Sequence, residues 1–421
     1  MPNNNKTKKV GYSEKTTMPP LGIISIGGYL KLHGYEVDYL DLFTRNMKKT
    51  EFLDYVSECN PDVIGISSYT ENFSVVINLT DLIKITFPKI LIILGGPHVT
   101  FCPEEALKCP SVDFVSRGEG EMTFVELLEA LNYNTLRLEE IQGISYRDEK
   151  GNIIHNEDRK FIHKLDSLPW ADMSTEKKKI YNIKQLIITS RGCPGKCIYC
   201  ASSALSGNRY RMRSAENVFS EIYYKYKYKG ERYFAFLDDT FTANRKRLLR
   251  FCELIKKNKI DIVWRCDSRT DILSYELIDH MYDSGCTSVH IGIESGSQEV
   301  IDTINKHISL QKSEELLAYM SKKGMQVMCS FIIGHHCDTK ETVRMTLDLA
   351  KKFKNNYGAV VGISINTPFP GTALYENREE LGVKLESTKW ATYDLVQPVI
   401  STKYLTKEEL QEFFYEIQET M

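Results

Sequence analysis

Apolar and polar positions alternate in two ways along residues 1–135. Short apolar runs rich in β-branched residues predict buried strands, and longer stretches with helical apolar spacing predict helices. The predicted strands are Tyr35–Leu42, Pro61–Ser67, Lys89–Leu94 and Val112–Ser116, and the predicted helices are Phe73–Thr86, Pro103–Lys108 and Met122–Leu131. Apolar strands separated by helices indicate a parallel sheet covered on both faces, a doubly wound α/β domain of Rossmann or flavodoxin type.

Residues 136–183 change in character. Gly143–Tyr146 and Asn152–His155 predict a small hairpin around Asp148–Gly151, and a polar, Lys-rich stretch follows. We interpret residues 136–183 as a linker between domains. At the other end of the first domain, Met1–Thr17 contains no apolar run able to fill the first strand. We therefore expect the natural chain to begin upstream, which the intact mass of the native protein would test.

A second series of strands and helices occupies residues 184–385. Its predicted strands are Gln185–Ser190, Tyr233–Leu237, Asp261–Cys266, Ser288–Ile293, Gln326–Ile333 and Ala359–Asn366. Helices are predicted at Ala215–Lys229, Arg245–Asn258, Tyr275–Ser284, Lys312–Lys323 and Lys340–Lys354. Six units without closure predict a partial (βα)6 barrel of TIM type, whose chemistry sits where strands end. Residues 386–421 form a C-terminal extension with a predicted amphipathic helix, Leu405–Met421.

Composition narrows the class of protein. The chain has 421 residues, of which 42% are hydrophobic and 26% charged, which is typical of globular proteins. The net charge of -2 gives no indication of nucleic-acid binding. No apolar run approaches the ~18 residues of a membrane span, and the N-terminus lacks the apolar core of a secretory signal. Eleven cysteines, an odd number, fit a reducing cytoplasm better than a disulfide framework.

Three cysteines lie together directly after the first barrel strand, and they are Cys193, Cys197 and Cys200. Three thiolates in one compact loop can hold an iron–sulfur cluster, which usually takes four, so one iron would stay open. A zinc half-site is the alternative, although structural zinc takes four protein ligands. We expect the other eight cysteines to be small buried hydrophobic residues. These are Cys59, Cys102, Cys109, Cys252, Cys266, Cys286, Cys329 and Cys337.

The Cys-x3-Cys-x2-Cys spacing after this strand resembles that of the radical S-adenosylmethionine enzymes. The resemblance implies a [4Fe–4S] cluster on the three cysteines, S-adenosylmethionine on the open iron, and Tyr199 beside the adenine. It also implies that residues at later strand ends contact S-adenosylmethionine, namely Asp238, Asp239, Arg269, Glu294, Ser295 and Gly334. The ordinary alternative for each is a helix cap or a surface ion pair. His335–Thr339 departs from the family pattern, and we favour a loop before a helix N-cap over an extra metal site.

The first domain resembles the cobalamin-binding domains that precede radical barrels. Glycine turns let the backbone approach a flat macrocycle, and helix N-termini favour its phosphate. The candidate contacts are Pro20, Gly22, Ser67, Thr70, Gly95, Gly96, His98, Gly118, Glu119 and Gly120. These positions are also consistent with the turns of any doubly wound domain. The Asp-x-His-x-x-Gly motif that supplies a cobalt ligand is absent, and neither His33 nor His98 fits it.

Together the two resemblances imply a cobalamin-dependent radical S-adenosylmethionine methyltransferase that acts on an unactivated carbon or phosphorus through a 5′-deoxyadenosyl radical and methylcobalamin. The alternatives are a non-methylating cyclase or rearrangement enzyme, a tRNA methylthiotransferase, and a non-catalytic cobalamin carrier or sensor. The cysteine triad argues against the carrier, because a carrier needs no cluster. We expect a small-molecule or peptide substrate and an electron donor such as flavodoxin or ferredoxin.

One further stretch, Tyr223–Lys229, interleaves tyrosine with lysine. Such a pattern can grip a peptide or single-stranded nucleic acid. At helical spacing we favour a solvated lysine face with buried tyrosines.

Overall fold

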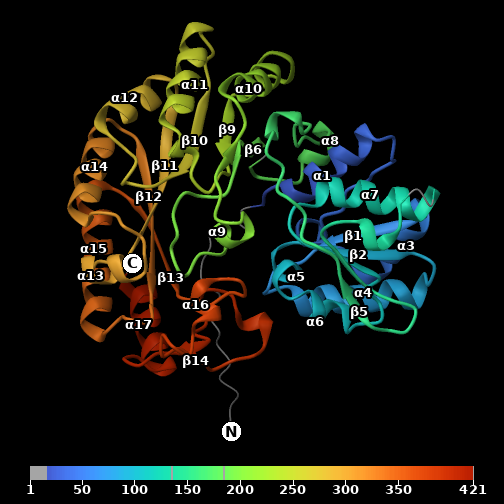
Figure 1. Cartoon of the computed structure of the whole chain (residues 1–421). Helices are drawn as coiled ribbons and strands as arrows, with labels where there is room; N and C mark the ends of the chain where they lie inside the picture. Colours follow the sequence, from blue (N-terminus) through green and yellow to red (C-terminus); the bar gives the residue numbers. More distant parts are fainter. Residues whose placement is uncertain (1–16, 134–135, 184, 421) are drawn as a thin grey trace.

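The structure, a computed structural model, describes residues 17–133, 136–183 and 185–420. The chain forms two α/β units that lie side by side, with the linker between them (Figure 1). The expectation of an upstream start concerns residues 1–16, which lie outside the described residues. Within the described residues, no helix has the length and apolar character that crossing a membrane requires.

The first sheet has five strands in the order of the chain: β1 (Val63–Ser67), β2 (Leu91–Gly95), β3 (Phe114–Ser116), β4 (Ile144–Arg147) and β5 (Ile153–His155). The first three strands are parallel, and β4 and β5 are antiparallel. β4 and β5 are the predicted hairpin, but β4 pairs with β3, and Ile144 and Tyr146 are buried. The hairpin therefore belongs to the first sheet and not to the linker.

The helices of the first unit are α1 (Leu21–Leu32), α2 (Leu42–Arg45), α3 (Lys49–Cys59), α4 (Phe73–Thr86), α5 (Pro97–Phe101), α6 (Pro103–Leu107) and α7 (Gly120–Tyr133), with α8 (Thr175–Lys178) in the linker. The predicted strand Tyr35–Leu42 is wrong, because residues 35–41 are irregular and α2 begins at Leu42. A strand requires a neighbour to satisfy its backbone groups. Here Tyr39 packs instead against Leu21 and Ile24 of α1.

The second sheet contains the six predicted barrel strands, all parallel. Its order is β13 (Val360–Ile365), β12 (Gln326–Ile333), β11 (Cys286–Glu294), β10 (Val263–Ser268), β9 (Tyr233–Phe236) and β6 (Leu186–Ile187). Its core contains an aromatic cluster in which Trp264 meets Phe236 and Phe251 edge to face at 5.6 and 5.8 Å. Four of the scattered cysteines lie in this core, as expected, whereas Cys59 is exposed.

The barrel helices are α9 (Ala201–Leu205), α10 (Ala215–Lys229), α11 (Arg245–Lys257), α12 (Tyr275–Asp283), α13 (Gln298–Thr303), α14 (Leu310–Lys322) and α15 (Lys340–Tyr357). Apart from α9, which follows the cysteine loop on the side of the first unit, they lie along the outer side of the sheet (Figure 1). Polar caps define their ends: Ser214 accepts from the Asn217 N–H at the start of α10, and Thr339 accepts from Thr342 at the start of α15. The latter confirms a helix cap after the His335–Asp338 loop.

The tyrosine–lysine stretch on α10 follows the prediction only in part: Lys227 and Lys229 are exposed and Tyr226 packs against the core, as expected. The other positions differ. Tyr223, Tyr224 and Tyr228 are exposed, whereas Lys225 is buried. The Lys225 ammonium pairs with Glu221 at 2.7 Å, one turn earlier in the helix, and Glu221 also pairs with Arg213 at 2.7 Å. This buried ion pair compensates the desolvation of Lys225, so the lysine can take the inward position.

The segment after β13, which ends in the predicted C-terminal extension 386–421, connects the two units. It contains α16 (Ala373–Glu376), the antiparallel pair β14 (Lys384–Leu385) and β15 (Ile400–Ser401), a short 3-10 turn at Trp390–Thr392, and α17 (Lys407–Thr420), the predicted terminal helix. Trp390 donates to Glu105 of the first unit at 2.7 Å, and its ring lies 5.2 Å from that of His98. The extension therefore holds the first unit against the barrel.

Candidate active site

The cysteine loop begins at a short antiparallel pair, β7 (Ser190–Arg191) with β8 (Arg211–Met212), and ends where α9 starts after Cys200. Gly192 has φ +85, and a Cβ there would meet the Arg209 carbonyl oxygen at 2.1 Å. Only glycine fits this turn. The loop lies on the side of the barrel that faces the first unit (Figure 1).

Two of the three cysteine sulfurs are in hydrogen-bond contact with polar groups, which come from the strand ends and from the loop itself. Cys193 Sγ lies 3.1 Å from Thr240 Oγ1, beyond β9, and accepts from the Gly195 N–H at 3.3 Å. Cys197 Sγ accepts from Arg269, beyond β10, at 3.6 Å. Burial raises the pKa of the Cys200 thiol. Among the described residues, no three Cys, His, Asp or Glu side chains are grouped as the ligands of a single metal ion.

Asp238 supports the stem of this loop. Its carboxylate accepts from the Thr189 N–H at 2.6 Å and the Ser190 hydroxyl at 2.7 Å, and also from the Thr189 hydroxyl. It is 1% exposed and lies 3.6 Å from Arg247. Because its oxygens are occupied inside the protein, the structure gives Asp238 a supporting position. Asp239, the next residue, is exposed at the end of the strand.

Arg269 is buried beside the cysteine loop. Its guanidinium forms two bonds of 3.0 Å with Asp271 and donates to the Lys306 carbonyl at 2.6 Å, in addition to its contact with Cys197. A Cβ at Gly195 would lie 2.5 Å from Arg269 Nη1. The glycine therefore makes room for a cation against the cysteine loop.

A buried ion pair joins Glu294 to Lys306 at 2.8 Å. Glu294 ends β11 with φ +72, a conformation that is costly for a residue other than glycine and that recurs at functional sites. Sequence reasoning predicted Glu294 but missed Lys306. Lys306 lies in an irregular turn between α13 and α14, where neither periodicity nor a motif points to it.

Tyr199 of the cysteine loop contacts the residues that follow β12. The Tyr199 ring lies 5.4 Å from that of His335, and burial, together with Glu294 and the cysteines, raises the Tyr199 pKa. Gly334 has φ +84, and its N–H donates to Asp338 at 3.0 Å. Ser295 is instead bonded to Thr346 of α15 at 3.2 Å. The structure thus brings together Tyr199, Glu294 and Gly334, and it directs Ser295 toward α15.

In the first unit, the predicted residues after β1 and β2 interlock. Gly96 has φ +99, and a Cβ there would lie 2.7 Å from the Ser68 carbonyl oxygen, with the Ser67 hydroxyl also in contact. His98 is buried, and its Nδ1 lies 3.3 Å from the Thr70 hydroxyl. Burial lowers the pKa of His98 to about 4, so its ring is neutral. Gly95, the last residue of β2, accepts from the Ser68 N–H at 2.7 Å.

The loop after β3 contacts the cysteine loop directly. Glu119 accepts from Arg191 at 2.8 Å and from Arg211 at 2.8 Å, and Arg191 also pairs with Glu121. Gly118 has φ +71 and open space where a Cβ would stand, whereas a Cβ at Gly120 would meet Ile26 at 2.8 Å. Glu119 was predicted as a cofactor contact, and the structure uses its carboxylate as a bridge between the two units.

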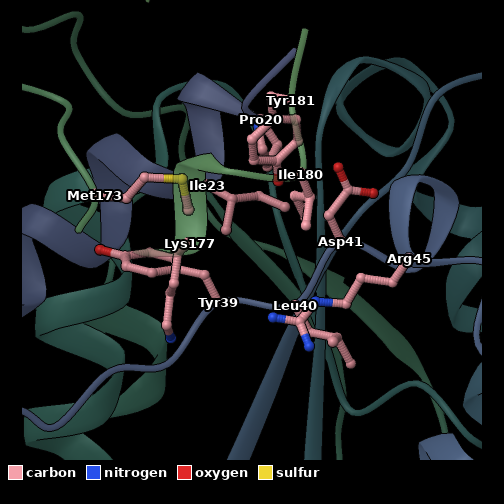
Figure 2. Close-up of a pocket in the computed structure, with 10 residues that line it drawn as sticks. All are labelled: Pro20, Ile23, Tyr39, Leu40, Asp41, Arg45, Met173, Lys177, Ile180 and Tyr181. Carbon is pink, nitrogen blue, oxygen red and sulfur yellow. The ribbon is translucent and has the colours of Figure 1, made fainter. Parts of the chain in front are cut away.

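The head of α1 lies apart from this contact. Pro20 precedes α1, and Gly22 in its first turn has open space in place of a side chain. Pro20 and Ile23 line a small recess together with Tyr39 of the irregular segment and with Met173 and Tyr181 of the linker (Figure 2). None of the three cysteines lines this recess.

Comparisons with known proteins match both units. A family model described as B12 binding domain matches residues 8–128, and one described as radical SAM superfamily matches residues 187–350. An uncharacterized methyltransferase of Pyrococcus horikoshii is 33% identical over 400 residues, which cover 94% of this chain and 86% of that protein. The chain belongs to the cobalamin-binding radical S-adenosylmethionine enzymes.

Two further similarities agree with this family. The anaerobic magnesium-protoporphyrin IX monomethyl ester cyclase of Rubrivivax gelatinosus is 26% identical over 403 residues, which cover 93% of this chain and 71% of that protein. The solved structure of the radical S-adenosylmethionine methyltransferase TsrM from Kitasatospora setae, with cobalamin and a [4Fe–4S] cluster bound, has a TM-score of 0.77 at 16% identity, covering 95% of this chain and 86% of that one. This likeness confirms the predicted fold class.

The residues present fit the cofactors of this enzyme family, which are a [4Fe–4S] cluster, S-adenosylmethionine and cobalamin. The three thiols belong to one loop, and the donors from Gly195 and Arg269 reach two of their sulfurs, where hydrogen bonds tune an iron–sulfur cluster. Gly22 and Gly118 leave backbone open to a flat macrocycle in the first unit. The family assignment also argues against a zinc half-site.

Proposed function

We propose that this enzyme transfers a methyl group to an unactivated carbon or phosphorus of a small-molecule or peptide substrate. The observation that carries the proposal is the 33% identity to an uncharacterized methyltransferase across both units, which the Arg191–Glu119 pair joins at 2.8 Å. When bound, the cluster with S-adenosylmethionine supplies a 5′-deoxyadenosyl radical, and cobalamin supplies the methyl group.

The chain's own side chains bind and orient these groups. Cys193, Cys197 and Cys200 would hold the cluster, and Arg269 together with the Lys306–Glu294 pair would bind the charged methionine end of S-adenosylmethionine. Tyr199, Gly334 and Asp239 would contact the adenosine. In the first unit, the turns at Gly95–His98 and at Gly118, with Pro20, Gly22, Ser67 and Thr70, would hold the cobalamin.

The test is anaerobic reconstitution with iron, sulfide, cobalamin, S-adenosylmethionine and a reductant, followed by product analysis with candidate substrates. Methylation gives both 5′-deoxyadenosine and S-adenosylhomocysteine, together with a substrate heavier by one methylene. A Cys197→Ser chain treated in the same way is the control and yields neither nucleoside. Cobalamin binding without either nucleoside from the unaltered chain would instead support a carrier or sensor.

A cyclase or rearrangement enzyme is the second candidate, because one similar protein of this family is a magnesium-protoporphyrin monomethyl ester cyclase. 5′-Deoxyadenosine without S-adenosylhomocysteine would favour this candidate.

We also propose that the enzyme acts in the cytoplasm with flavodoxin or ferredoxin as electron donor, which is consistent with all eleven cysteines being free. Replacing the chemical reductant by reduced flavodoxin tests the donor.

A further inference from the structure

His335 is a buried polar side chain that no contact within the described residues explains. It follows Gly334 at the carboxyl end of β12 and is 1% exposed. Its Nε2 atom is buried and has no hydrogen-bond partner. A buried polar atom left without a partner costs about as much as a lost hydrogen bond. Such an atom beside a binding site points to a ligand that completes it.

The backbone holds this imidazole in place. The N–H groups of Gly334 and His335 both donate to the Asp338 carboxylate, at 3.0 and 2.9 Å. Asp338 also accepts from the Thr342 hydroxyl at 2.7 Å, in the first turn of α15. The backbone that carries the ring is thus fixed between two regular elements, β12 and α15.

Charge divides the region around His335 into two parts. The charged groups, Arg269 with Asp271 and Lys306 with Glu294, lie beside the cysteine loop. The His335 ring faces the Tyr199 ring at 5.4 Å, and burial, with His336 and Lys306 nearby, lowers its pKa to about 3, which keeps it neutral. S-adenosylmethionine has the same division, with a charged methionine end and a neutral aromatic base.

We infer that His335 Nε2 forms a hydrogen bond with the polar edge of the adenine of S-adenosylmethionine and thereby helps to select this nucleoside. The inference rests on the proposed binding of S-adenosylmethionine, and it adds to that site a residue for which the sequence predicted only a loop. A neutral imidazole has one donor and one acceptor nitrogen, so it can pair with either kind of atom on the purine edge.

The experiment measures equilibrium binding of S-adenosylmethionine to the reconstituted protein by dialysis under nitrogen. His335→Phe should raise the dissociation constant about tenfold, which corresponds to about 1.4 kcal/mol. His335→Gln, whose amide nitrogen reaches a similar position, should recover much of the affinity. His280→Phe, the same substitution at an exposed position of α12, is the matched control and should bind as the unaltered chain does.

Analogues of S-adenosylmethionine locate the bond. One lacks the 6-amino group, and three replace N1, N3 or N7 of the purine by carbon. At least one should bind the unaltered chain about tenfold more weakly than S-adenosylmethionine, yet bind His335→Phe as well as S-adenosylmethionine does. This coupling isolates the pair from general loosening of the site. If His335→Phe does not fold, His335→Ala, which also removes the imidazole, completes the cycle.

Equal affinities for S-adenosylmethionine and all four analogues, in the unaltered chain and in the variant, would overturn the inference. A metal ion lost from the protein in His335→Phe would also overturn it, because the nitrogen would then be a metal ligand. If the unaltered chain binds no S-adenosylmethionine, the proposed function fails as well. If it binds S-adenosylmethionine but methylates nothing, only the proposed function fails.

Discussion

Replacing Arg191 by methionine should remove the main electrostatic bridge between the two units. The Arg191 guanidinium pairs with Glu119 at 2.8 Å and with Glu121 at 2.5 Å, and the side chain of Glu121 is 4% exposed. Removing one partner of a buried ion pair costs about 3–5 kcal/mol, because the other charge stays buried. The Arg191 side chain is itself 23% exposed, so we expect the lower end, about 3 kcal/mol.

The assay is the midpoint of thermal unfolding, which should fall by roughly 6–12 °C for a loss of this size in a domain of 150–250 residues. Arg250→Met is the matched control. Arg250 also joins two glutamates, Glu216 at 2.7 Å and Glu253 at 2.9 Å, but all three side chains are exposed. Exposed pairs contribute about 0–1 kcal/mol, so the control should shift the midpoint by roughly 4 °C or less.

The pH dependence provides a second check. Burial alone would raise the pKa of Glu121, but Arg191 and the Ser25 hydroxyl hold it below its ordinary 4.5. In the native chain, the resulting stabilisation is present above that value and is lost as the pH falls through the lowered pKa. Without Arg191, burial raises the pKa of Glu121, and protonation at lower pH removes the cost of a buried, unpaired carboxylate. The difference in unfolding midpoint between the native chain and Arg191→Met should therefore become smaller as the pH falls from 8 toward about 5. Equal small shifts for Arg191→Met and Arg250→Met, independent of pH, would refute this reasoning.

Three further changes test the site. Cys197→Ala should abolish the visible absorbance of the reconstituted cluster, whereas Cys329→Ala, in the barrel core, should keep it; persistent absorbance in the first variant would place the cluster elsewhere. Gly195→Ala should reduce iron bound per chain several-fold, because the new Cβ would lie 2.5 Å from Arg269 Nη1, and unchanged iron content would contradict the crowding. Burial raises the pKa of Asp338 from 3.8 to about 6, so its contribution to stability is present below 3.8 and is lost as the pH rises through about 6. Asp338→Asn should remove this pH-dependent loss of stability, so its unfolding midpoint should change less with pH than that of the native chain. Parallel changes of the midpoint with pH in the two chains would contradict this prediction.

Local sequence predicted the parts of the fold in which pattern and packing agree. The six barrel strands are short segments rich in apolar residues, and each becomes a strand of one parallel sheet. The cysteine loop is equally local, because its three thiols, its glycine turn and its stem fall within eleven consecutive residues of the chain, Ser190–Cys200. In both cases the information lies within a short window, so no distant partner is needed to interpret it.

The parts that sequence missed depend on distant partners. Tyr35–Leu42 has the composition of a strand, yet α1 buries Tyr39, and no neighbouring strand pairs with this segment among the described residues. Lys225 is buried because Arg213 and Glu221 share an ion-pair cluster with it. Lys306 reaches Glu294 only through the turn after α13. Periodicity cannot reveal a charge whose counter-charge lies on another element.

The position of Arg191 has a consequence for how the protein assembles. This residue stands two positions before Cys193, so the segment that receives iron and sulfide also anchors the B12-binding half. Coupling of this kind is reciprocal. Iron–sulfur loading should slow hydrogen exchange in the amides around Glu119, and vitamin uptake should slow the escape of iron from the thiols. Oxidative loss of the cluster should consequently also weaken the binding of cobalamin, so a single event would inactivate both halves of the protein.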